Sequence, residues 1–560
     1  MPGNGAYCAS KAGLIAYLQS LRAELRPTAL RVHTISPGYL RTPLTAGNRF
    51  AMPGLLEADE AARRLLAGVA AGTEHIVLPR RIGWLSHALD LLPARLHDRI
   101  LLGQPRKPAR GRTRRDRHSR PEKMTTPTEQ QIALIGAGPS GLAGARCLQK
   151  HGIPFQGFEA HTDVGGLWNI HNPRSTVYQS AHLISSKRMT EFSEFPMPER
   201  VADYPSHREL LDYFSAFADH FRLREHYRFG VRVLSVVPVS DAPGTLWRVT
   251  TEDADGLQTT ADYKGVVVAN GTLAEPNMPR FEGHFSGELL HTSAYKSADQ
   301  FRYKRVLIVG AGNSGCDIAV DAVHQARSVD ISVRRGYYFV PKYVFGQPAD
   351  TLGGKIRLPP WLKQKIDSTI LKWFTGDPVR FGFPKPTYKM YESHPVVNSL
   401  ILYHIGHGDV GVRADIARFD GHTVHFKDGR QGEYDLVLAA TGYRLHYPFL
   451  DPALLNWQGM APRLYLNIFA PRFDRLAVLG MVEASGLGWQ GRYEQAELVA
   501  RYFKGLDEGK ASARAFRIAK AGPPPDLSGG YKYLQLERMA YYVNKNVYRD
   551  TVRQAAEALA

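Results

Sequence analysis

No apolar run in the sequence approaches the roughly eighteen residues needed to cross a bilayer, and the N-terminus lacks the basic, apolar and small-residue series of a signal peptide. Cysteine is scarce as well, with only Cys8, Cys147 and Cys316 in 560 residues. Their odd number and wide separation argue against a disulfide framework, and no Cys-x-x-Cys pair is present for dithiol redox chemistry. These absences predict a soluble, cytoplasmic protein without a transmembrane segment.

Positive charge is in excess and unevenly spread. The net charge is +18, a value also found in proteins that bind nucleic acid or an anionic membrane surface. Residues 105–123 alone hold nine Lys or Arg against Asp116 and Glu122. Such a segment is typical of a solvated linker, so we predict a basic linker over residues 105–130 and no nucleic-acid partner. An arm that binds polyanions is the alternative.

The first residues contain a tyrosine and a lysine four positions apart, Tyr7 and Lys11. On a helix this spacing places both side chains on one face, where the ammonium lowers the pKa of the phenol and prepares it for acid–base chemistry. The surrounding pattern predicts the tail of an α/β sheet. Its expected elements are helix 5–26, strand 31–37, helix 57–71, strand 75–80 and helix 84–102.

A glycine turn directly follows the apolar strand QIALIG and opens a helix. Its G-x-G-x-x-G spacing permits a tight turn, a close approach of pyrophosphate to the backbone, and close packing of helix on strand. The next strand ends in Glu159, a carboxylate suited to ribose hydroxyls. We predict a flavin-type dinucleotide site, with core packing as the alternative for Trp168. Its residues are Gly136, Gly138, Ser140, Gly141, Glu159, Gly166, Leu167 and Trp168.

A second turn of the same kind follows the strand KRVLIVG. The strand after its helix ends in two arginines where an NAD site would carry a carboxylate, and guanidinium groups pair with a 2′-phosphate, so NADP is favoured. The predicted NADP residues are Gly310, Gly312, Asn313, Ser314, Gly315, Arg334 and Arg335. A flavin site and an NADP site together predict hydride flow from nicotinamide to flavin. With no Cys-x-x-Cys pair, dioxygen is the expected acceptor.

The two turns predict an α/β fold with two nested Rossmann-like domains, for FAD and NADP, after a partial α/β unit. Residues 412–429 alternate like a β-meander. The apolar run 435–443 is predicted to return to the first sheet, with Ala440, Thr441 and Gly442 beside a cofactor. The predicted parts are a partial unit (1–104), the linker (105–130), the FAD domain (131–300), the NADP domain with an insertion (301–434), the returning part of the FAD domain (435–510) and a helical tail (511–560).

Residues 285–296, FSGELLHTSAYK, match the pattern F-x-G-x-x-x-H-x-x-x-Y. This pattern resembles the identifying motif of the flavin-containing monooxygenases, class B flavoprotein monooxygenases, whereas Baeyer–Villiger monooxygenases usually carry Trp in place of Tyr295. The segments EFSEFPMPE, YPSHRELLDYF, HPVVNSL and ATGY follow the family's order, and the resemblance covers about residues 130–505. By the residues alone, His291 and Tyr295 are interpreted as a satisfied structural pair between domains.

The resemblance implies a small-molecule substrate, O2, FAD and NADPH. It further implies that one oxygen atom of O2 is inserted into a soft nitrogen or sulfur nucleophile through a C4a-hydroperoxyflavin. The alternatives are a Baeyer–Villiger oxygenase acting on ketones, a poorly coupled NADPH oxidase that makes hydrogen peroxide, and, in another class, a polyanion-binding flavoprotein. The oligomeric state stays open, with a homodimer as one possibility.

The sequence departs from the family beside the expected flavin. Ile184 stands where the family carries asparagine, followed by Ser185 and Ser186 as in the family. Isoleucine cannot donate a hydrogen bond, so tight coupling is in question; Ser185 and Ser186 are the candidate catalytic residues, and Ser185 a candidate FAD contact. Glu483 and Ala484 likewise replace a frequent Gln-Pro pair.

The N-terminal part resembles the C-terminal half of a short-chain dehydrogenase/reductase over about residues 2–100. Tyr7 and Lys11 match that family's Y-x-x-x-K pair, and Pro37, Gly38 and Thr42 match its nicotinamide-side loop. A glycine turn and the active-site serine are missing, so no independent dehydrogenase activity is expected. The part is either a truncated fusion domain or a relic joined to an upstream reading frame, and Met124 is a plausible start of the larger protein.

Three histidines and an aspartate lie near one another in the sequence, and they raise the possibility of a metal site: His394, His404, His407 and Asp409. Their surroundings resemble family scaffold, so we predict no metal.

Overall fold

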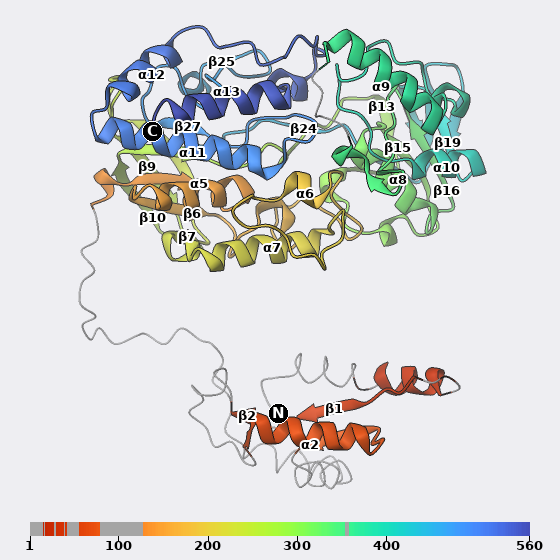
Figure 1. Ribbon diagram of the computed structural model, residues 1–560. Coiled ribbons are helices and arrows are strands. Elements are labelled where there is room, and N and C mark those ends of the chain that lie inside the picture. The colour runs from red at the N-terminus through yellow and green to blue at the C-terminus, as the bar shows by residue number, and fades with distance from the viewer. Residues whose placement is uncertain are drawn as a thin grey trace. The chain divides into compact units, whose positions relative to one another are not determined.

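The computed structural model describes residues 15, 17–26, 28, 30–37, 40–41, 55–78, 127–352 and 358–560. The chain divides into two compact units, Met1–Lys123 and Met124–Ala560. Each unit is described by itself (Figure 1). The dyad Tyr7 and Lys11, the loop residues Gly38 and Thr42, the helix expected over 84–102 and the basic linker over 105–126 lie outside the described residues.

Among its described residues, the smaller unit contains two parallel strand pairs, the helix α2 and a helical segment over 17–25. β1 (Thr34–Pro37) pairs in parallel with β4 (His75–Leu78), β2 (Leu40–Arg41) pairs with β3 (Leu56–Glu57), and α2 (Ala58–Ala70) connects β3 to β4. Ala61, Ile76 and Leu78 form its buried core. The order strand, helix, strand confirms the sequence prediction over these residues.

The larger unit contains two five-stranded parallel sheets. The first has the order β27-β11-β5-β6-β7, and helices α5 (Pro139–Lys150) and α11 (Gly488–Asp507) pack against each other beside it (Figure 1). Its strands β5 and β11 are buried along their whole length, as their unbroken apolar sequences require. The bounds are β5 (Ile132–Ile135), β6 (Phe155–Glu159), β7 (Tyr227–Phe229), β11 (Gly265–Val268) and β27 (Leu476–Val478).

The second sheet has the order β14-β23-β15-β16-β19, with helices α8 (Asn313–Val323) and α10 (Leu400–His407). Its strands are β14 (Glu288–His291), β15 (Arg305–Val309), β16 (Ser328–Ser332), β19 (Val410–Arg413) and β23 (Leu436–Ala439). Strand β23 pairs with β14 and β15, so the prediction that run 435–443 returns to the first sheet is wrong. An all-apolar sequence is compatible with any parallel strand that is covered on both faces, so it does not show to which sheet the strand belongs. The strand that returns to the first sheet is the three-residue β27.

Two smaller sheets contain the antiparallel pairs that the hairpin-like and meander-like patterns predict. One is an antiparallel three-stranded sheet with the order β10-β9-β8. The other has four strands in the order β13-β20-β21-β22, in which β13 pairs with β20 in parallel and the other pairs are antiparallel. The bounds are β8 (Arg232–Pro238), β9 (Trp247–Glu252), β10 (Gln258–Tyr263), β13 (Glu282–Phe285), β20 (Ile416–Gly421), β21 (Thr423–Phe426) and β22 (Gln431–Glu433). Two-stranded pairs are β12 (Glu275–Pro276) with β24 (Tyr443–Arg444), β17 (Tyr343–Val344) with β18 (Gln347–Pro348), and β25 (Trp457–Gln458) with β26 (Ala461–Pro462).

The remaining α-helices connect the sheets and end the chain. They are α6 (Lys187–Thr190), α7 (His207–His220), α9 (Pro360–Thr375), α12 (Ala511–Ala521) and α13 (Lys545–Glu557). Helix α13 packs on α11, burying Tyr548 and Val552, while an irregular stretch over 522–544 joins α12 to α13. Among the described residues, no helix is both long and apolar enough to cross a membrane.

Candidate functional site

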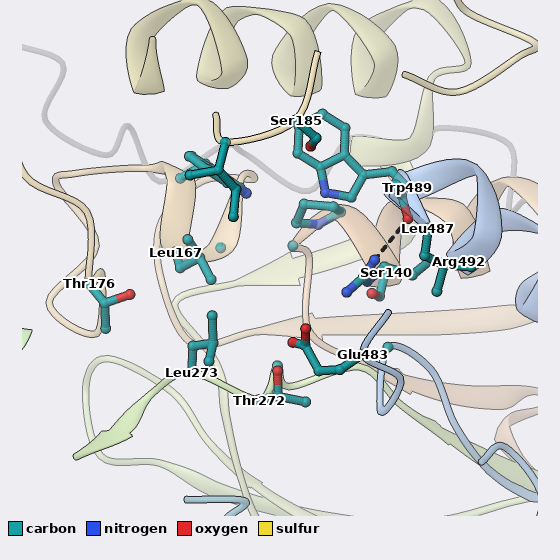
Figure 2. Close-up of a pocket in the computed structure, with 18 of the residues that line it drawn as sticks. Ser140, Leu167, Thr176, Ser185, Thr272, Leu273, Glu483, Leu487, Trp489 and Arg492 are labelled. Carbon is teal, nitrogen blue, oxygen red and sulfur yellow. Dashed lines mark hydrogen bonds between the residues drawn. The ribbon is translucent and has the colours of Figure 1, made fainter. Parts of the chain in front are cut away.

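A cavity of about 1320 Å³ in the larger unit is lined by residues of both glycine turns. Figure 2 shows side chains that project into it from well-separated segments, among them Leu167, Ser185, Thr272 and Arg492. The sequence-predicted residues that line it are Gly136, Gly138, Ser140, Glu159, Gly166, Leu167, Trp168, Ser185, Asn313 and Ser314.

The first turn has the shape that its glycines require. Gly136 has a φ of +107°, and a Cβ at Gly141 would lie 1.9 Å from the carbonyl oxygen of Gly136. Gly138 has more room than Gly141, because the nearest atom to a Cβ at Gly138 would be the Gly166 Cα at 3.5 Å. The hydroxyl of Tyr227 stabilises the turn by donating to the carbonyl oxygens of Gly136 (3.2 Å) and Gly141 (3.1 Å). The open side of this turn, at the N-terminus of α5, fits a pyrophosphate group.

Glu159 ends β6 and lines the cavity. Its carboxylate accepts hydrogen bonds from the backbone N–H of Ala137 (2.7 Å) and of His161 (2.9 Å). Burial raises the pKa of Glu159, while these backbone donors act in the opposite direction. A carboxylate has about four lone-pair sites, so two remain to accept from hydroxyl groups, which fits a ribose.

Trp168 both packs and lines the cavity. It ends the short helix η2 (Gly166–Trp168), and its ring lies edge-to-face on Trp489 with the ring centroids 6.1 Å apart. Trp168 also packs against two of the large apolar clusters of the unit. The core interpretation of Trp168 is confirmed, and its contact with FAD stays a prediction.

The second turn repeats this geometry at the end of β15. Gly310 has a φ of +105°, and a Cβ at Gly315 would lie 2.0 Å from the carbonyl oxygen of Gly310. A Cβ at Gly312 would meet nothing within 4 Å, which leaves room for a phosphate group. The Asn313 side chain donates to the carbonyl oxygen of Pro395 (3.2 Å) and accepts from the N–H of Val397 (2.7 Å).

The two arginines after β16 lie outside the cavity lining. Arg334 is exposed, and the half-buried Arg335 guanidinium lies 5.3 Å from the ring centroid of Tyr337. No ion pair engages Arg334 among the residues that the structure describes. An exposed guanidinium at the carboxyl end of this strand fits a 2′-phosphate on NADP.

Ala440, Thr441 and Gly442 lie against the second turn and do not line the cavity. The carbonyl oxygen of Ala440 would be 2.7 Å from a Cβ at Gly310. Thr441 donates its hydroxyl to the carbonyl oxygen of Asn277 (2.7 Å). Because β23 belongs to the second sheet, these residues belong to the second nucleotide unit and not to the FAD unit predicted from the sequence.

The motif residues His291 and Tyr295 are satisfied structural residues. His291 Nε2 bonds the carbonyl oxygen of Gly442 (2.9 Å), and burial lowers the pKa of its imidazole. Tyr295 is fully buried, stacks on Phe301 and donates to Asp321 at 2.5 Å. These contacts tie the segment to the second sheet and its helix α8, and they support the structural interpretation.

Of the two candidate catalytic serines, only Ser185 lines the cavity, next to Ile184. Its hydroxyl lies 2.8 Å from that of Thr190. Ser186 is 1% exposed, its backbone N–H donates to Asp350 (2.7 Å), and its hydroxyl finds no hydrogen-bond partner among the described residues. Ser186 is the N-cap residue of α6 and does not line the cavity, and its catalytic role stays a prediction.

A charged cluster around the buried Glu483 in the cavity wall was not predicted from the sequence. Glu483 pairs with Arg538 at 2.9 Å; burial alone would raise the pKa of Glu483, but the guanidinium groups of Arg538 and Arg492 hold it below its ordinary value. His394 lies beside them, its Nδ1 3.3 Å from the hydroxyl of Tyr542. Three segments that are distant in the sequence meet here, and the signal in the sequence is the replacement of the family's Gln by Glu483.

The three candidate metal ligands do not assemble. His394 lines the cavity, whereas His404 pairs with Asp409 at 2.9 Å and His407 packs on Tyr403. The described residues contain no group of three or more His, Cys, Asp or Glu placed to hold a metal ion.

The fold and the cavity define a class: an oxidoreductase that binds two dinucleotides on neighbouring parallel sheets. The family model of flavin-binding monooxygenase-like proteins matches residues 129–516, and that of short chain dehydrogenases matches residues 1–52. The chain belongs to the flavin-containing monooxygenase family and carries an N-terminal short-chain dehydrogenase fragment. Membership in this family implies FAD and NADPH.

Relatives of known sequence cover most of the larger unit. Flavin-containing monooxygenase 5 of Oryctolagus cuniculus is 32% identical over 397 residues, 67% of this chain and 74% of the relative. Dimethylaniline monooxygenase [N-oxide-forming] 2 of Pan troglodytes is 32% identical over 396 residues, with the same coverage.

Solved structures share the fold at lower identity. A flavin-containing monooxygenase from Stenotrophomonas maltophilia matches with a TM-score of 0.51 and 21% identity, over 67% of this chain and 98% of that one. The open crystal structure of cyclohexanone monooxygenase matches with a TM-score of 0.55 and 20% identity, over 76% and 97%. These likenesses confirm an α/β fold with two Rossmann-like domains.

Proposed function

We propose that the protein is an NADPH- and FAD-dependent monooxygenase that places one oxygen atom of O2 on a soft nitrogen or sulfur nucleophile of a small molecule. The observation that carries this proposal is that both glycine turns open into one cavity. A nicotinamide on the second turn and a flavin on the first would then share one enclosed space, as direct hydride transfer requires.

The residues present fit both groups. Gly138, Ser140, Glu159 and Gly166 would hold FAD. The open backbone at Gly312, with Asn313, Ser314, Arg334 and Arg335 near it, would hold NADPH. Bound FAD would accept hydride from NADPH and supply the oxygen-transfer chemistry with O2.

Residues of this chain enclose the reacting groups and exclude water from the cavity around them. Leu167, Leu273, Leu487 and Trp489 present apolar surface to it, which excludes water (Figure 2). Ser185 is the hydroxyl beside Ile184, and Thr190 fixes its direction at 2.8 Å. Since a soft nucleophile needs no proton removed by the protein, these groups only position and enclose.

Ile184 also favours a second candidate, an NADPH oxidase that releases hydrogen peroxide. The apolar side chain lines the cavity and offers no hydrogen bond where the family carries asparagine. The two functions differ in peroxide yield per NADPH.

The test supplies the full chain with NADPH and O2 and then, separately, with methyl phenyl sulfide, N,N-dimethylaniline or cyclohexanone. We expect sulfoxide or N-oxide in amounts comparable to the NADPH consumed. Lactone from the ketone with no sulfoxide would indicate the Baeyer–Villiger reaction, and peroxide equal to NADPH with every substrate would indicate the oxidase.

We also propose that the protein works in a reducing cytoplasm. Of the cysteines that the structure describes, Cys147 and Cys316 are both buried and free. Burial raises the pKa of both thiols, so neither is poised for redox chemistry.

A further inference from the structure

The last part of the chain supplies one wall of the cavity, which we call the C-terminal wall (residues 531–546). Among the residues that it contributes to the cavity lining are Tyr531, Tyr533, Arg538, Tyr542 and Lys545. All of them lie after residue 516, where the match to the flavin-binding monooxygenase-like family model ends. The backbone N–H of Val543 donates to the carbonyl oxygen of Glu483 (2.9 Å), so the C-terminal wall runs beside segment 483–486. The chemistry of this wall is thus outside the segment that defines the family.

Lys545 is a cation of the C-terminal wall without a partner. It is half-buried at the start of α13, and a Cβ at Gly486 would lie 3.2 Å from its Nζ. Among the residues that the structure describes, no hydrogen bond or ion pair engages its ammonium group. Arg549, one turn further along α13, is instead paired with Glu494 at 2.6 Å. A half-buried ammonium group without a partner costs free energy, and a bound anion would offset that cost.

Arg538 is a second cation of the C-terminal wall with hydrogen-bonding capacity left. Its ion pair with Glu483 (2.9 Å) uses Nη2, and 43% of the Arg538 side chain is still exposed. A guanidinium group has five N–H donors, so several of them stay available to a molecule in the cavity. The carboxylate of Glu483, by contrast, is buried and already held. The donors that remain on this wall are therefore cationic.

Lys545 lies within electrostatic reach of the segment that borders the expected flavin. Burial lowers the pKa of Lys545, and the nearby carboxylate of Asp350 acts in the opposite direction without forming an ion pair with it. Asp350 accepts the backbone N–H of Ser186 (2.7 Å), and its Oδ1 is shielded from solvent. Ser186 directly follows Ser185, which lines the cavity beside Ile184. An anion bound at Lys545 would therefore keep the rest of a small molecule near the reacting side of the cavity.

We infer that Lys545, together with Arg538, binds an anionic group of the substrate, so that the protein acts on soft nucleophiles that carry a carboxylate. Carboxylates accept charge-assisted hydrogen bonds from lysine and arginine, and such bonds are stronger in a partly buried site than in water. A neutral or cationic thioether would leave the ammonium group of Lys545 unpaired. This inference names the substrate class of the cavity and rests on the proposed function.

The experiment compares three thioethers that differ in the charge of one end: 3-(methylthio)propanoate, 3-(methylthio)propanamide and 3-(methylthio)propylamine. Sulfoxide formed by the full chain with FAD and NADPH is measured for each. We expect kcat/KM for the propanoate to exceed that for the propanamide about tenfold, because a hydrogen bond between charged groups contributes about that factor. The amine should be the poorest substrate. Equal kcat/KM for all three would overturn the inference and leave the proposed function intact.

The variant Lys545→Gln should lower the preference for the propanoate over the propanamide about tenfold, through the KM for the propanoate. Lys545→Arg keeps the charge and should keep the preference. Lys532→Gln, at an exposed position of the C-terminal wall that does not line the cavity, is the matched control and should behave like the wild type. An unchanged preference in Lys545→Gln would overturn the inference. If the KM for NADPH rose instead, Lys545 would be a contact of the cofactor's phosphates.

Binding is measured separately with 3-(methylsulfonyl)propanoate, a sulfone whose sulfur cannot be oxidised further. Isothermal titration calorimetry should show about tenfold tighter binding to the wild type than to Lys545→Gln, and flavin absorbance of both proteins shows that they are folded. Binding of the sulfone without sulfoxide from any of the three thioethers would support the inference and contradict the proposed function. A wild type that binds the sulfone no more tightly than Lys545→Gln does would overturn the inference, whatever the activity.

Discussion

Ile184 is an apolar side chain in the cavity wall, next to a hydroxyl that is already held by Thr190. In this position a side chain that donates a hydrogen bond can stabilise a polar group beside the flavin, and isoleucine cannot. We therefore propose that Ile184 limits the coupling of NADPH consumption to oxygenation.

We predict that Ile184→Asn lowers the hydrogen peroxide released per NADPH at least twofold in the presence of a thioether. Ile184→Val, which stays apolar, is the control and should leave the yield unchanged. The measurement is peroxide and sulfoxide per NADPH in the same reaction. Equal peroxide from Ile184→Asn and the wild type would show that Ile184 does not govern coupling.

His394 is a half-buried imidazole whose Nε2 is shielded from solvent, and the sign of its effect on stability follows from the direction of its pKa shift. Burial lowers its pKa from 6.5 to about 4, with nearby Arg538 acting in the same direction. In the unfolded chain His394 is protonated below about pH 6.5, whereas in the folded chain it is protonated only below about pH 4. Stability is therefore lost as the pH falls through this window. The loss from this group between pH 7 and pH 5 is about 2 kcal/mol.

His394→Asn should therefore flatten the fall in unfolding free energy between pH 7 and pH 5 relative to the wild type. Urea unfolding at the two pH values measures it, and only the difference between variant and wild type is used, because other groups titrate in both. A fall as steep in the variant as in the wild type would mean that His394 does not titrate as its burial requires.

At the scale of elements, the second and third glycines of the two strand–turn–helix units have different surroundings. A Cβ at the third glycine would meet a carbonyl oxygen at 1.9 Å (Gly141) or 2.0 Å (Gly315), whereas a Cβ at the second glycine Gly312 would meet nothing within 4 Å. Any cost of a methyl group at Gly312 must then come from a bound molecule.

We predict that Gly312→Ala folds and retains FAD but raises the KM for NADPH at least tenfold, whereas Gly141→Ala loses FAD and stability. Flavin absorbance of the purified proteins, thermal unfolding and NADPH titration measure these effects. An unchanged KM in Gly312→Ala would place NADPH elsewhere.

The glycine turns and the motif order could be predicted from the sequence, because G-x-G-x-x-G spacing fixes local geometry in a few residues. The sheet to which run 435–443 belongs could not be predicted, because an unbroken apolar strand fits either sheet. Only its pairing with β15 in the structure assigns it to the second sheet. That Ser185 lines the cavity and Ser186 does not could not be predicted either, because it depends on how the loop before helix α6 is packed. The cluster of Glu483, Arg538 and His394 depends on long-range packing that no local pattern encodes.

At the scale of the whole molecule, the chain consists of two compact units with the break at Lys123. Every described residue of the cavity belongs to the larger unit, Met124–Ala560. We propose that this unit is self-sufficient and that the short-chain dehydrogenase fragment takes no part in the reaction.

A protein that begins at Met124 should retain FAD and oxidise NADPH at the rate of the full chain, within twofold. Tyr7→Phe in the full chain should leave that rate unchanged as well. Flavin content and NADPH consumption are the measurements. Loss of FAD from the shorter protein, or a large loss of activity in Tyr7→Phe, would show that the chemistry depends on the N-terminal unit.

The central claim is that one cavity brings FAD, NADPH and O2 together to oxygenate a soft nucleophile. The most direct test supplies the full chain with NADPH, methyl phenyl sulfide and ¹⁸O2 and analyses the sulfoxide by mass spectrometry. The account predicts one ¹⁸O atom in the sulfoxide and the other in water, with sulfoxide formed in proportion to NADPH consumed. NADPH consumption without labelled sulfoxide, with all of the oxygen recovered as peroxide, would contradict it.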